Sequence, residues 1–222
     1  MLRTVRLFSV VLVVLLGAVW GVAWFARAPG ESIADAFLRQ IAALTGGNMP
    51  APSAGGVQLA QGIALGGPFT LVDHTGRAVT ERDFAGRMLL VYFGFTYCPD
   101  VCPTELGTIA AALDAMGPAA ERVTPVFVSI DPERDTPEVL DKYVAAFDPG
   151  FVALYGTPAQ TAKTASDFNV FYQKVPTGSS YTMDHTALSF VFDRHGKLQL
   201  ALQHSQSVDE CVDDLRQVFA LA

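Results

Sequence analysis

The chain contains few cysteines and comparatively little positive charge. Three of its 222 residues are cysteines, Cys98, Cys102 and Cys211, which is too few for a disulfide scaffold. Its 15 lysine and arginine residues are outnumbered by 22 aspartates and glutamates, and the formal net charge at pH 7 is −7. Affinity for nucleic acid comes mainly from neutralising phosphates, so binding to nucleic acid is not expected. The sequence also lacks internal repeats.

The longest uncharged stretch lies near the amino terminus. Residues 7–26 contain no charged side chain, and about 20 such residues span the apolar core of a bilayer. Arg3 and Arg6 precede this stretch, and basic residues of this kind stay on the cytoplasmic side. We therefore expect residues 1–27 to form a single-pass transmembrane anchor in the inner (plasma) membrane, with the carboxyl-terminal domain in the periplasm.

Two alternatives to this topology remain open. A cleaved signal peptide would also export the domain, although the apolar core of such a peptide is usually only about 7–15 residues long. A mitochondrial intermembrane space could replace the periplasm, although the short basic lead is unlike a long serine- and arginine-rich presequence.

Residues 28–56 are expected to connect the anchor to the folded domain. Residues 31–45 place apolar side chains at helical spacing, which predicts a short amphipathic helix beside the membrane. Residues 46–56 are rich in glycine, proline and small side chains, a composition typical of a flexible linker. The folded domain is then expected over residues 57–222, a length that suits a single domain.

The predicted domain alternates strands and helices. Strands are expected at residues 69–72, 77–79, 88–95, 123–130, 151–154, 187–193 and 198–202, and helices beginning near Pro103, Thr136, Thr157 and Ser207. A strand–helix–strand unit is followed by an insertion with an extra helix and strand, and then by a terminal hairpin and helix. This order predicts an α/β, thioredoxin-like fold in which helices cover both faces of the sheet.

The strongest chemical signal is the segment LVYFGFTYCPDVCPTEL at residues 90–106. A buried strand leads Cys98 and Cys102 onto the start of a helix, whose partial positive charge is expected to lower thiol pKa values. Two accessible thiolates close together could form a disulfide or bind a soft metal such as copper(I), zinc or an iron–sulfur cluster. Three residues separate the cysteines, one more than in ordinary thioredoxin-type motifs, and the wider spacing favours a metal without excluding a disulfide.

A histidine supplies a candidate third ligand. His185 lies just before an apolar strand, where a thioredoxin-like fold places a loop opposite the cysteine loop. Two thiolates and one imidazole suit copper in either oxidation state. A lone histidine, however, is more often structural than metal-binding. Structural or surface roles are expected for the other three histidines, His74, His195 and His204.

Three further residues have more than one interpretation. Asp131 follows a strand at the end where α/β proteins place functional loops, so it could contact a partner or only shape a turn. Asp184 could orient His185 or form a turn. Cys211 lies on the apolar face of the last helix, which predicts a buried structural thiol.

Four stretches of the chain resemble the Sco/SenC family. They are GGPFTLVD at residues 66–73, VYFGFTYCPDVCPTEL at 91–106, VSIDPERDTP at 128–137 and YTMDHTALSFVFD at 181–193. The resemblance implies a thioredoxin-like copper protein that assists assembly of the CuA centre of cytochrome c oxidase. It also implies that Cys98, Cys102 and His185 bind the copper ion. The implied partner is cytochrome c oxidase subunit II, and other periplasmic copper chaperones are further candidates.

The sequence leaves three functions open. A copper chaperone would bind copper and transfer it to a partner. A thiol–disulfide oxidoreductase would use Cys98 and Cys102 as a redox-active disulfide to reduce the cysteines of the CuA site. A copper or redox sensor is the third class. His185 discriminates between the first two functions, because a pure reductase does not need it beside the cysteines.

Overall fold

The computed structural model describes residues 65–148 and 150–221. The predicted anchor at residues 1–27 and the predicted connecting segment at residues 28–56 both lie outside the described residues. Within the described part of the chain, no helix is long and apolar enough to cross a membrane.

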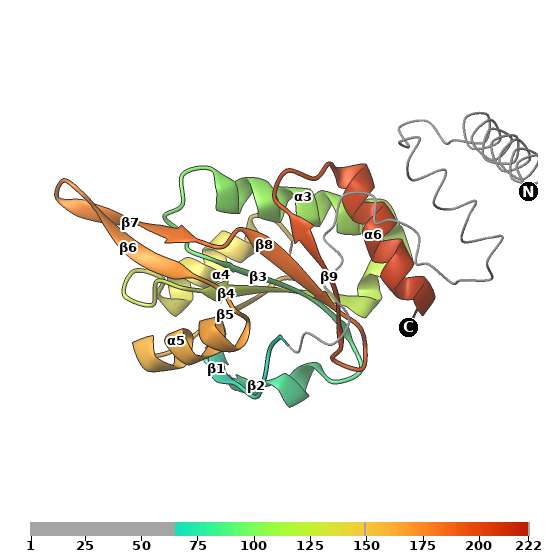
Figure 1. The fold of residues 1–222 in the computed structure, drawn as a ribbon, viewed down its shortest axis with the longest axis horizontal. Coiled ribbons are helices and arrows are strands. Elements are labelled where there is room, and N and C mark those ends of the chain that lie inside the picture. Colours follow the sequence, from blue (N-terminus) through green and yellow to red (C-terminus); the bar gives the residue numbers. More distant parts are fainter. Residues whose placement is uncertain (1–64, 149, 222) are drawn as a thin grey trace, which may run out of the picture. The chain divides into compact units, whose positions relative to one another are not determined.

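A mixed β-sheet runs through the centre of the described residues (Figure 1). Its seven strands in that part of the chain lie in the order β2 (Ala78–Thr80), β1 (Thr70–Asp73), β5 (Val152–Tyr155), β4 (Val123–Ser129), β3 (Met88–Gly94), β8 (Leu188–Phe192) and β9 (Leu198–Gln203). β3, β4 and β5 are parallel, whereas β8 is antiparallel to both β3 and β9. At the other edge, β1 pairs antiparallel with β2 and β5.

Helices cover both faces of this sheet. Those with described bounds are α3 (Val101–Met116), α4 (Pro137–Ala145), α5 (Pro158–Asp167) and α6 (Val208–Leu221), with two short 3-10 helices, η1 (Glu81–Phe84) and η2 (Gly117–Arg122). The side chains of Thr136 and Thr157 cap α4 and α5, and a proline follows each threonine at the first helical position. A capping oxygen and a preset proline φ angle both favour helix initiation, which confirms the predicted starts.

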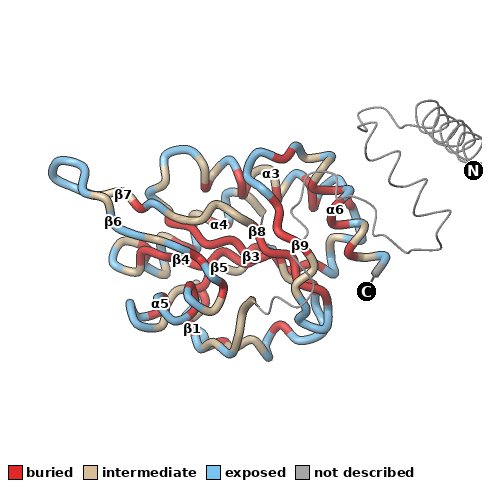
Figure 2. Tube along the Cα trace, viewed as in Figure 1, coloured by how far each residue is buried: buried red, intermediate tan, exposed pale blue. Residues whose placement is uncertain are grey.

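The β3 strand is buried from both sides, as its continuous apolar sequence predicts. Tyr92 faces α3, where its hydroxyl lies 3.6 Å from Sγ of Cys102. The next side chain, Phe93, points to the opposite face and packs with its ring centroid 5.1 Å from that of Phe168, the residue after α5. Alternate side chains of one strand therefore enter two apolar layers, and the strands of the central sheet are the most buried part of the fold (Figure 2).

The unit β3–α3–β4 and the terminal unit β8–β9–α6 have the predicted thioredoxin-like order. The insertion between them contains α4, β5 and α5, all three of which the sequence predicted. It also contains a hairpin that the sequence analysis did not predict, formed by β6 (Tyr172–Thr177) and β7 (Ser180–His185). This hairpin is a separate two-stranded sheet that projects from the body of the domain (Figure 1).

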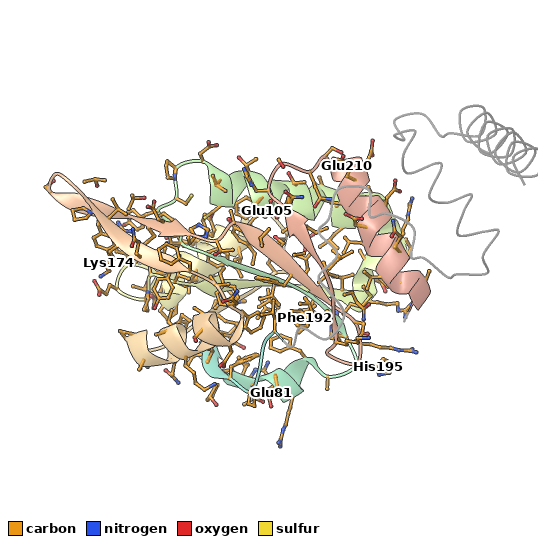
Figure 3. All side chains as sticks on the ribbon, viewed as in Figure 1. Glu81, Glu105, Lys174, Phe192, His195 and Glu210 are labelled. Carbon is orange, nitrogen blue, oxygen red and sulfur yellow. The ribbon has the colours of Figure 1, made fainter. Side chains whose placement is uncertain are left out.

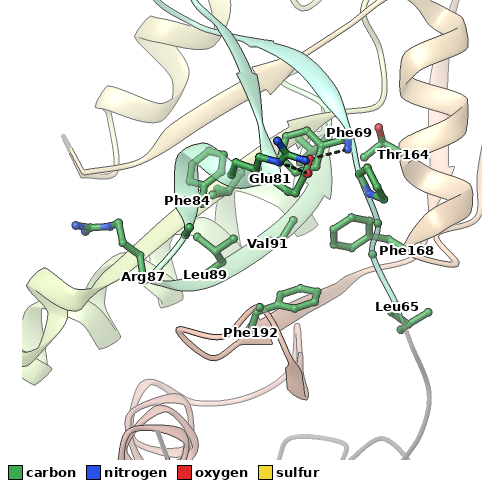
Figure 4. A pocket seen from close by; sticks show the side chains of 18 of the residues that line it. Leu65, Phe69, Glu81, Phe84, Arg87, Leu89, Val91, Thr164, Phe168 and Phe192 are labelled. Carbon is green, nitrogen blue, oxygen red and sulfur yellow. Dashed lines mark hydrogen bonds and ion pairs between the residues drawn. The ribbon is translucent and has the colours of Figure 1, made fainter.

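A hollow of about 490 Å³ lies on the α5 face of the sheet (Figure 4). Its lining is mainly apolar and includes Leu89, Val91, Phe168 and Phe192. The two cysteines of the candidate site do not line it, because Cys102 packs beside Tyr92 on the opposite face. The hollow therefore contributes nothing to the chemistry described next.

Candidate metal centre

Both cysteines of the predicted motif lie where β3 runs into α3. The Cys98 N–H donates to the carbonyl of Phe95 at 3.2 Å, which tightens the loop between the two elements. Asp100 directly precedes the helix, and Cys102 is its second residue, with 0% of its surface exposed. The strand ends at Gly94, where an added Cβ would lie 3.1 Å from Sγ of Cys102. The absence of a side chain at this position therefore lets the strand approach the sulfur closely.

The two cysteines adjoin each other but differ in exposure and in acidity. The Cys102 N–H lies 3.3 Å from Sγ of Cys98 and donates to it. The Cys102 thiol, His185 and the N–H groups of Cys102 and Asp100 lower the pKa of the Cys98 thiol to about 4, although partial burial opposes the shift. The neighbouring Cys98 and burial both raise the pKa of Cys102. At neutral pH the pair holds one thiolate, on the partly exposed Cys98.

The structure thus corrects one expectation about the cysteines. The helix start was expected to lower both thiol pKa values and to expose both sulfurs. This holds for Cys98, whose sulfur accepts an N–H of the helix, and it is wrong for Cys102. The Cys102 sulfur is buried against Tyr92, where the anionic form loses its hydration.

His185 is held beside Cys102 in a defined orientation. Its Nε2 lies 3.5 Å from Sγ of Cys102. Its Nδ1 lies 3.0 Å from the carbonyl oxygen of Thr186, and because a carbonyl can only accept, Nδ1 carries the proton. The other ring nitrogen, Nε2, is therefore the one that faces the sulfur and the one placed to bind a metal. The rings of Tyr92 and Phe95 meet the imidazole edge to face, at centroid distances of 6.0 Å and 5.9 Å.

The sequence predicts that His185 lies in a loop, and this prediction is wrong. His185 is the last residue of β7 and pairs with Tyr172 across the unpredicted hairpin. Neither strand has one buried face and one exposed face, since most of their residues are partly or fully exposed. The sequence therefore shows little alternation of apolar and polar residues there. A glycine at the turn, Gly178 with φ 61°, was the available signal for a hairpin.

Tyr92 is a site residue that sequence reasoning missed. It is fully buried, and its hydroxyl donates to the Cys102 sulfur. Burial and the nearby Cys102 raise its pKa, so the phenol stays protonated and remains a donor. A tyrosine within an otherwise apolar buried strand was the signal, because a buried phenol needs a hydrogen-bond partner.

Asp131 and Asp184, for which the sequence allowed more than one role, occupy different environments. The Asp131 side chain is fully buried, and its oxygens bind Arg134 and the hydroxyl of Tyr181. Asp184 is exposed and precedes His185 on β7, so the two side chains point to opposite faces of the strand. The contact that orients His185 comes from the Thr186 carbonyl.

The remaining histidines and the third cysteine have the environments expected of structural or surface groups. The backbone N–H of Ala153 donates to Nδ1 of His74 at 3.2 Å, and His195 and His204 are exposed. Cys211 is buried within α6, and burial, followed by nearby acidic groups, raises its pKa to about 12.

The chemistry of Cys98, Cys102 and His185 fits copper. Two sulfurs and one imidazole nitrogen are ligands that copper prefers, and the three residues lie beside one another. Among the described residues, no group of three or more histidine, cysteine or acidic side chains already forms a metal-binding cluster. The structure therefore places the three candidate ligands side by side without such a cluster being formed.

Comparisons with known proteins point to one family. The SCO1/SenC family model matches residues 57–220. The human protein SCO1 homolog, mitochondrial, is 42% identical over 137 residues, which cover 60% of this chain and 46% of that protein. The chain thus spans less than half the length of this curated relative.

Solved structures share the fold. Bradyrhizobium japonicum ScoI, determined with copper bound, has a TM-score of 0.66 and 44% identity over 70% of this chain and 99% of that one. BsSco, described as a member of the Sco family of cytochrome c oxidase assembly proteins, has a TM-score of 0.60 and 21% identity over 75% of this chain and 100% of that one. The thioredoxin-like expectation is thereby confirmed, and the chain belongs to the SCO1/SenC family.

Proposed function

We propose that this protein binds one copper ion through Cys98, Cys102 and His185. The observation that carries the proposal is the oriented imidazole, whose Nε2 lies 3.5 Å from the Cys102 sulfur while Nδ1 is bound to the Thr186 carbonyl. The similar ScoI structure from Bradyrhizobium japonicum contains copper, which supports the choice of metal. The ion is cargo rather than a resident catalyst in this proposal.

The proposed role of the bound copper is delivery to the CuA centre of cytochrome c oxidase, with subunit II as the partner. The link of a related protein to oxidase assembly supports this role. Tyr97 and Phe171 are the large apolar side chains exposed among the described residues, at 62% and 59%. Tyr97 precedes Cys98, and Phe171 hydrogen-bonds to Thr186, which follows His185. An apolar contact surface beside the ligands suits docking of a protein acceptor.

Reduction of the partner's CuA cysteines is a second candidate, and the asymmetry of the thiol pair favours it. The Cys98 thiolate would attack a disulfide of the partner and release one partner thiolate. Cys102 would then lose its proton and attack the Cys98 sulfur of the mixed disulfide, which releases the second partner thiolate. The products are a Cys98–Cys102 disulfide and two partner thiols, with two electrons transferred. The asymmetric acidity of Cys98 and Cys102 suits these two roles.

A His185→Ala variant distinguishes the two functions. Cells that carry only this variant are grown at limiting copper, and the CuA content of their oxidase is measured. Transfer of copper predicts that CuA content falls together with copper binding by the variant. Thiol reduction predicts normal CuA content with a copper-free protein, because both cysteines remain. That second result would exclude metal transfer by this site.

The proposed location is the inner membrane, with residues 1–27 as a single span and the domain in the periplasm. A membrane anchor confines the protein to the surface that holds the oxidase and raises the encounter rate. An alkaline phosphatase fused to the carboxyl terminus should be active in this orientation. Activity of a cytoplasm-only reporter at the same position would contradict it.

A further inference from the structure

We propose that residues 131–135, here called the bracket, set the position of His185 relative to the two cysteines. Arg134 and Asp135 are its positioning residues, the first bound to the hairpin and the second to the cysteine loop. The inference rests on the proposed copper site, because it concerns how the third ligand of that site is held. The bracket follows β4, and it contacts both the cysteine loop and the hairpin that carries His185.

Asp135 binds the loop that carries the cysteines. Asp135 is 1% exposed, and its carboxylate accepts hydrogen bonds from the N–H and hydroxyl of Thr96, the latter at 2.6 Å. It also accepts a bond from the Ser129 hydroxyl at 2.6 Å. Thr96 lies two residues before Cys98. Asp135 therefore restrains the backbone between the end of β3 and the first thiol.

Arg134 binds the hairpin. Arg134 donates from Nε to the buried carboxylate of Asp131 and from Nη1 to the carbonyl of Tyr181 at 2.9 Å. Its guanidinium carbon lies 3.7 Å from the ring centroid of Tyr181. The Tyr181 hydroxyl donates back to Asp131 at 2.8 Å. The bracket therefore contacts Tyr181 at its backbone carbonyl, its ring and its hydroxyl.

Tyr181 and His185 lie on one face of the same strand. Residues separated by four positions in a strand point the same way, and at about 3.3 Å per residue they are about 13 Å apart. Met183, between them on that face, is 5% exposed. A displacement of Tyr181 would therefore move the face that presents His185 to Cys102.

The hairpin needs such a constraint because it is not part of the central sheet. A two-stranded hairpin is marginally stable by itself in water. Lys174, which lies on the hairpin (Figure 3), also forms a surface ion pair with Glu133 of the bracket, with Nζ 2.6 Å from Oε2. Both of its side chains are substantially exposed, so it is expected to contribute little. The buried contacts of Arg134 are the ones that restrict the hairpin.

The test is a double-mutant cycle between Arg134 and His185, measured on the purified full-length chain. Copper(I) affinity is determined by competition with a colorimetric chelator. Loss of an outer residue that orients a metal ligand typically lowers affinity about 10–100-fold. Arg134→Ala should therefore weaken binding at least about tenfold in the native background and less than about twofold in a His185→Ala background.

The cycle separates failure of this inference from failure of the proposed site. Equal losses in both backgrounds, or no loss in the native background, would overturn the positioning role. If His185→Ala itself leaves copper affinity unchanged, the proposed site is wrong. Should Arg134→Ala not fold, Tyr181→Phe replaces it in the same cycle, because it removes only the hydroxyl bond to Asp131.

One control variant and one copper-free measurement complete the test. Arg77→Ala breaks another arginine–aspartate contact, to Asp73 at 3.2 Å in the turn between β1 and β2. It should change copper affinity less than about twofold. In the copper-free protein, Arg134→Ala should shift the ring-nitrogen NMR signals of His185, whereas Arg77→Ala should not. Unshifted His185 signals in Arg134→Ala would contradict the inference.

Discussion

The two parts of the candidate site are built on different kinds of structure. The cysteines belong to residues 94–102, which join a buried strand of the central sheet to the 16-residue helix α3. The histidine belongs to residues 172–185, a hairpin that forms a separate two-stranded sheet. Two of the proposed ligands are therefore fixed by core packing, and the third depends on a few polar and aromatic contacts.

This difference has a consequence for the proposed transfer of copper. Core packing permits little movement without a large cost in stability. A hairpin outside the sheet has fewer contacts to lose and can move while the domain stays folded. The arrangement allows the third ligand to be withdrawn without unfolding the domain, which would suit a protein that releases its copper to an acceptor.

The largest expected effect comes from removing the buried cysteine of the proposed site. Cys102→Ala should abolish copper binding, because one thiolate and one imidazole leave too few ligands and the sulfur beside His185 is gone. Copper content of the purified variant after gel filtration measures the loss. Cys211→Ala is the matched control, since it removes an equally buried thiol outside the site. The control should retain one copper per chain and lose about 1 kcal/mol of stability. Retention of copper by Cys102→Ala would refute the site.

A pair of glycine substitutions sharpens the comparison between core and hairpin. Gly94→Ala would place a Cβ 2.8 Å from the Phe127 ring and 3.1 Å from the Cys102 sulfur. Overpacking of this kind costs about 1–3 kcal/mol, and it should also weaken copper binding because it presses on a ligand. Gly178→Ala at the hairpin turn meets no atom within 4 Å, although its φ is 61°. It should cost about 1 kcal/mol and leave copper affinity unchanged.

Chemical denaturation and copper competition on the two variants measure both quantities. If Gly178→Ala weakened copper binding as much as Gly94→Ala, then strain at the hairpin turn would reach His185. The division between a core-fixed part and an independently held part of the site would then be wrong.

Prediction from sequence succeeded where local signals and packing agree. The apolar run of β3, the threonine–proline starts of α4 and α5, and the helix after the cysteines were all predicted, because each has a strong local cause. The candidate ligands were also identified from sequence. Their contact depends on tertiary structure, but the family resemblance and the thioredoxin-like order indicated that the segment before β8 faces the cysteine loop.

The hairpin and the bracket could not be predicted in the same way. Residues 172–185 lack a buried face with clear alternation, so their strands have no hydrophobic signature. The contacts of Arg134 with Tyr181 join residues 47 positions apart, and nothing in the local sequence of either residue indicates the other. Asp131 could be assigned a turn or a partner contact from sequence, but its burial appears only in the fold.

The smallest predicted effect concerns a buried acid behind the cysteines. Glu105 of α3 is 3% exposed and accepts a hydrogen bond from the Ser189 hydroxyl. Burial raises its pKa above 4.5, although the Ser189 bond and the charge of His204 oppose the shift. The folded state therefore retains a proton that the unfolded state loses near pH 4.5, so this group lowers the free energy of unfolding as pH rises from there through the folded-state pKa.

Glu105→Gln should remove this pH dependence while keeping an acceptor for Ser189. Urea unfolding of the copper-free protein between pH 4.5 and 8 should show that the stability of the variant, relative to the native protein, increases with pH and then levels off. The relative slope can reach at most about 1.4 kcal/mol per pH unit, the value for one proton. The thiols titrate in both proteins, so their contribution cancels in the difference. Parallel stability curves would show that Glu105 is ionised at the same pH in both states, and the core behind the cysteines would then be more polar than its burial indicates.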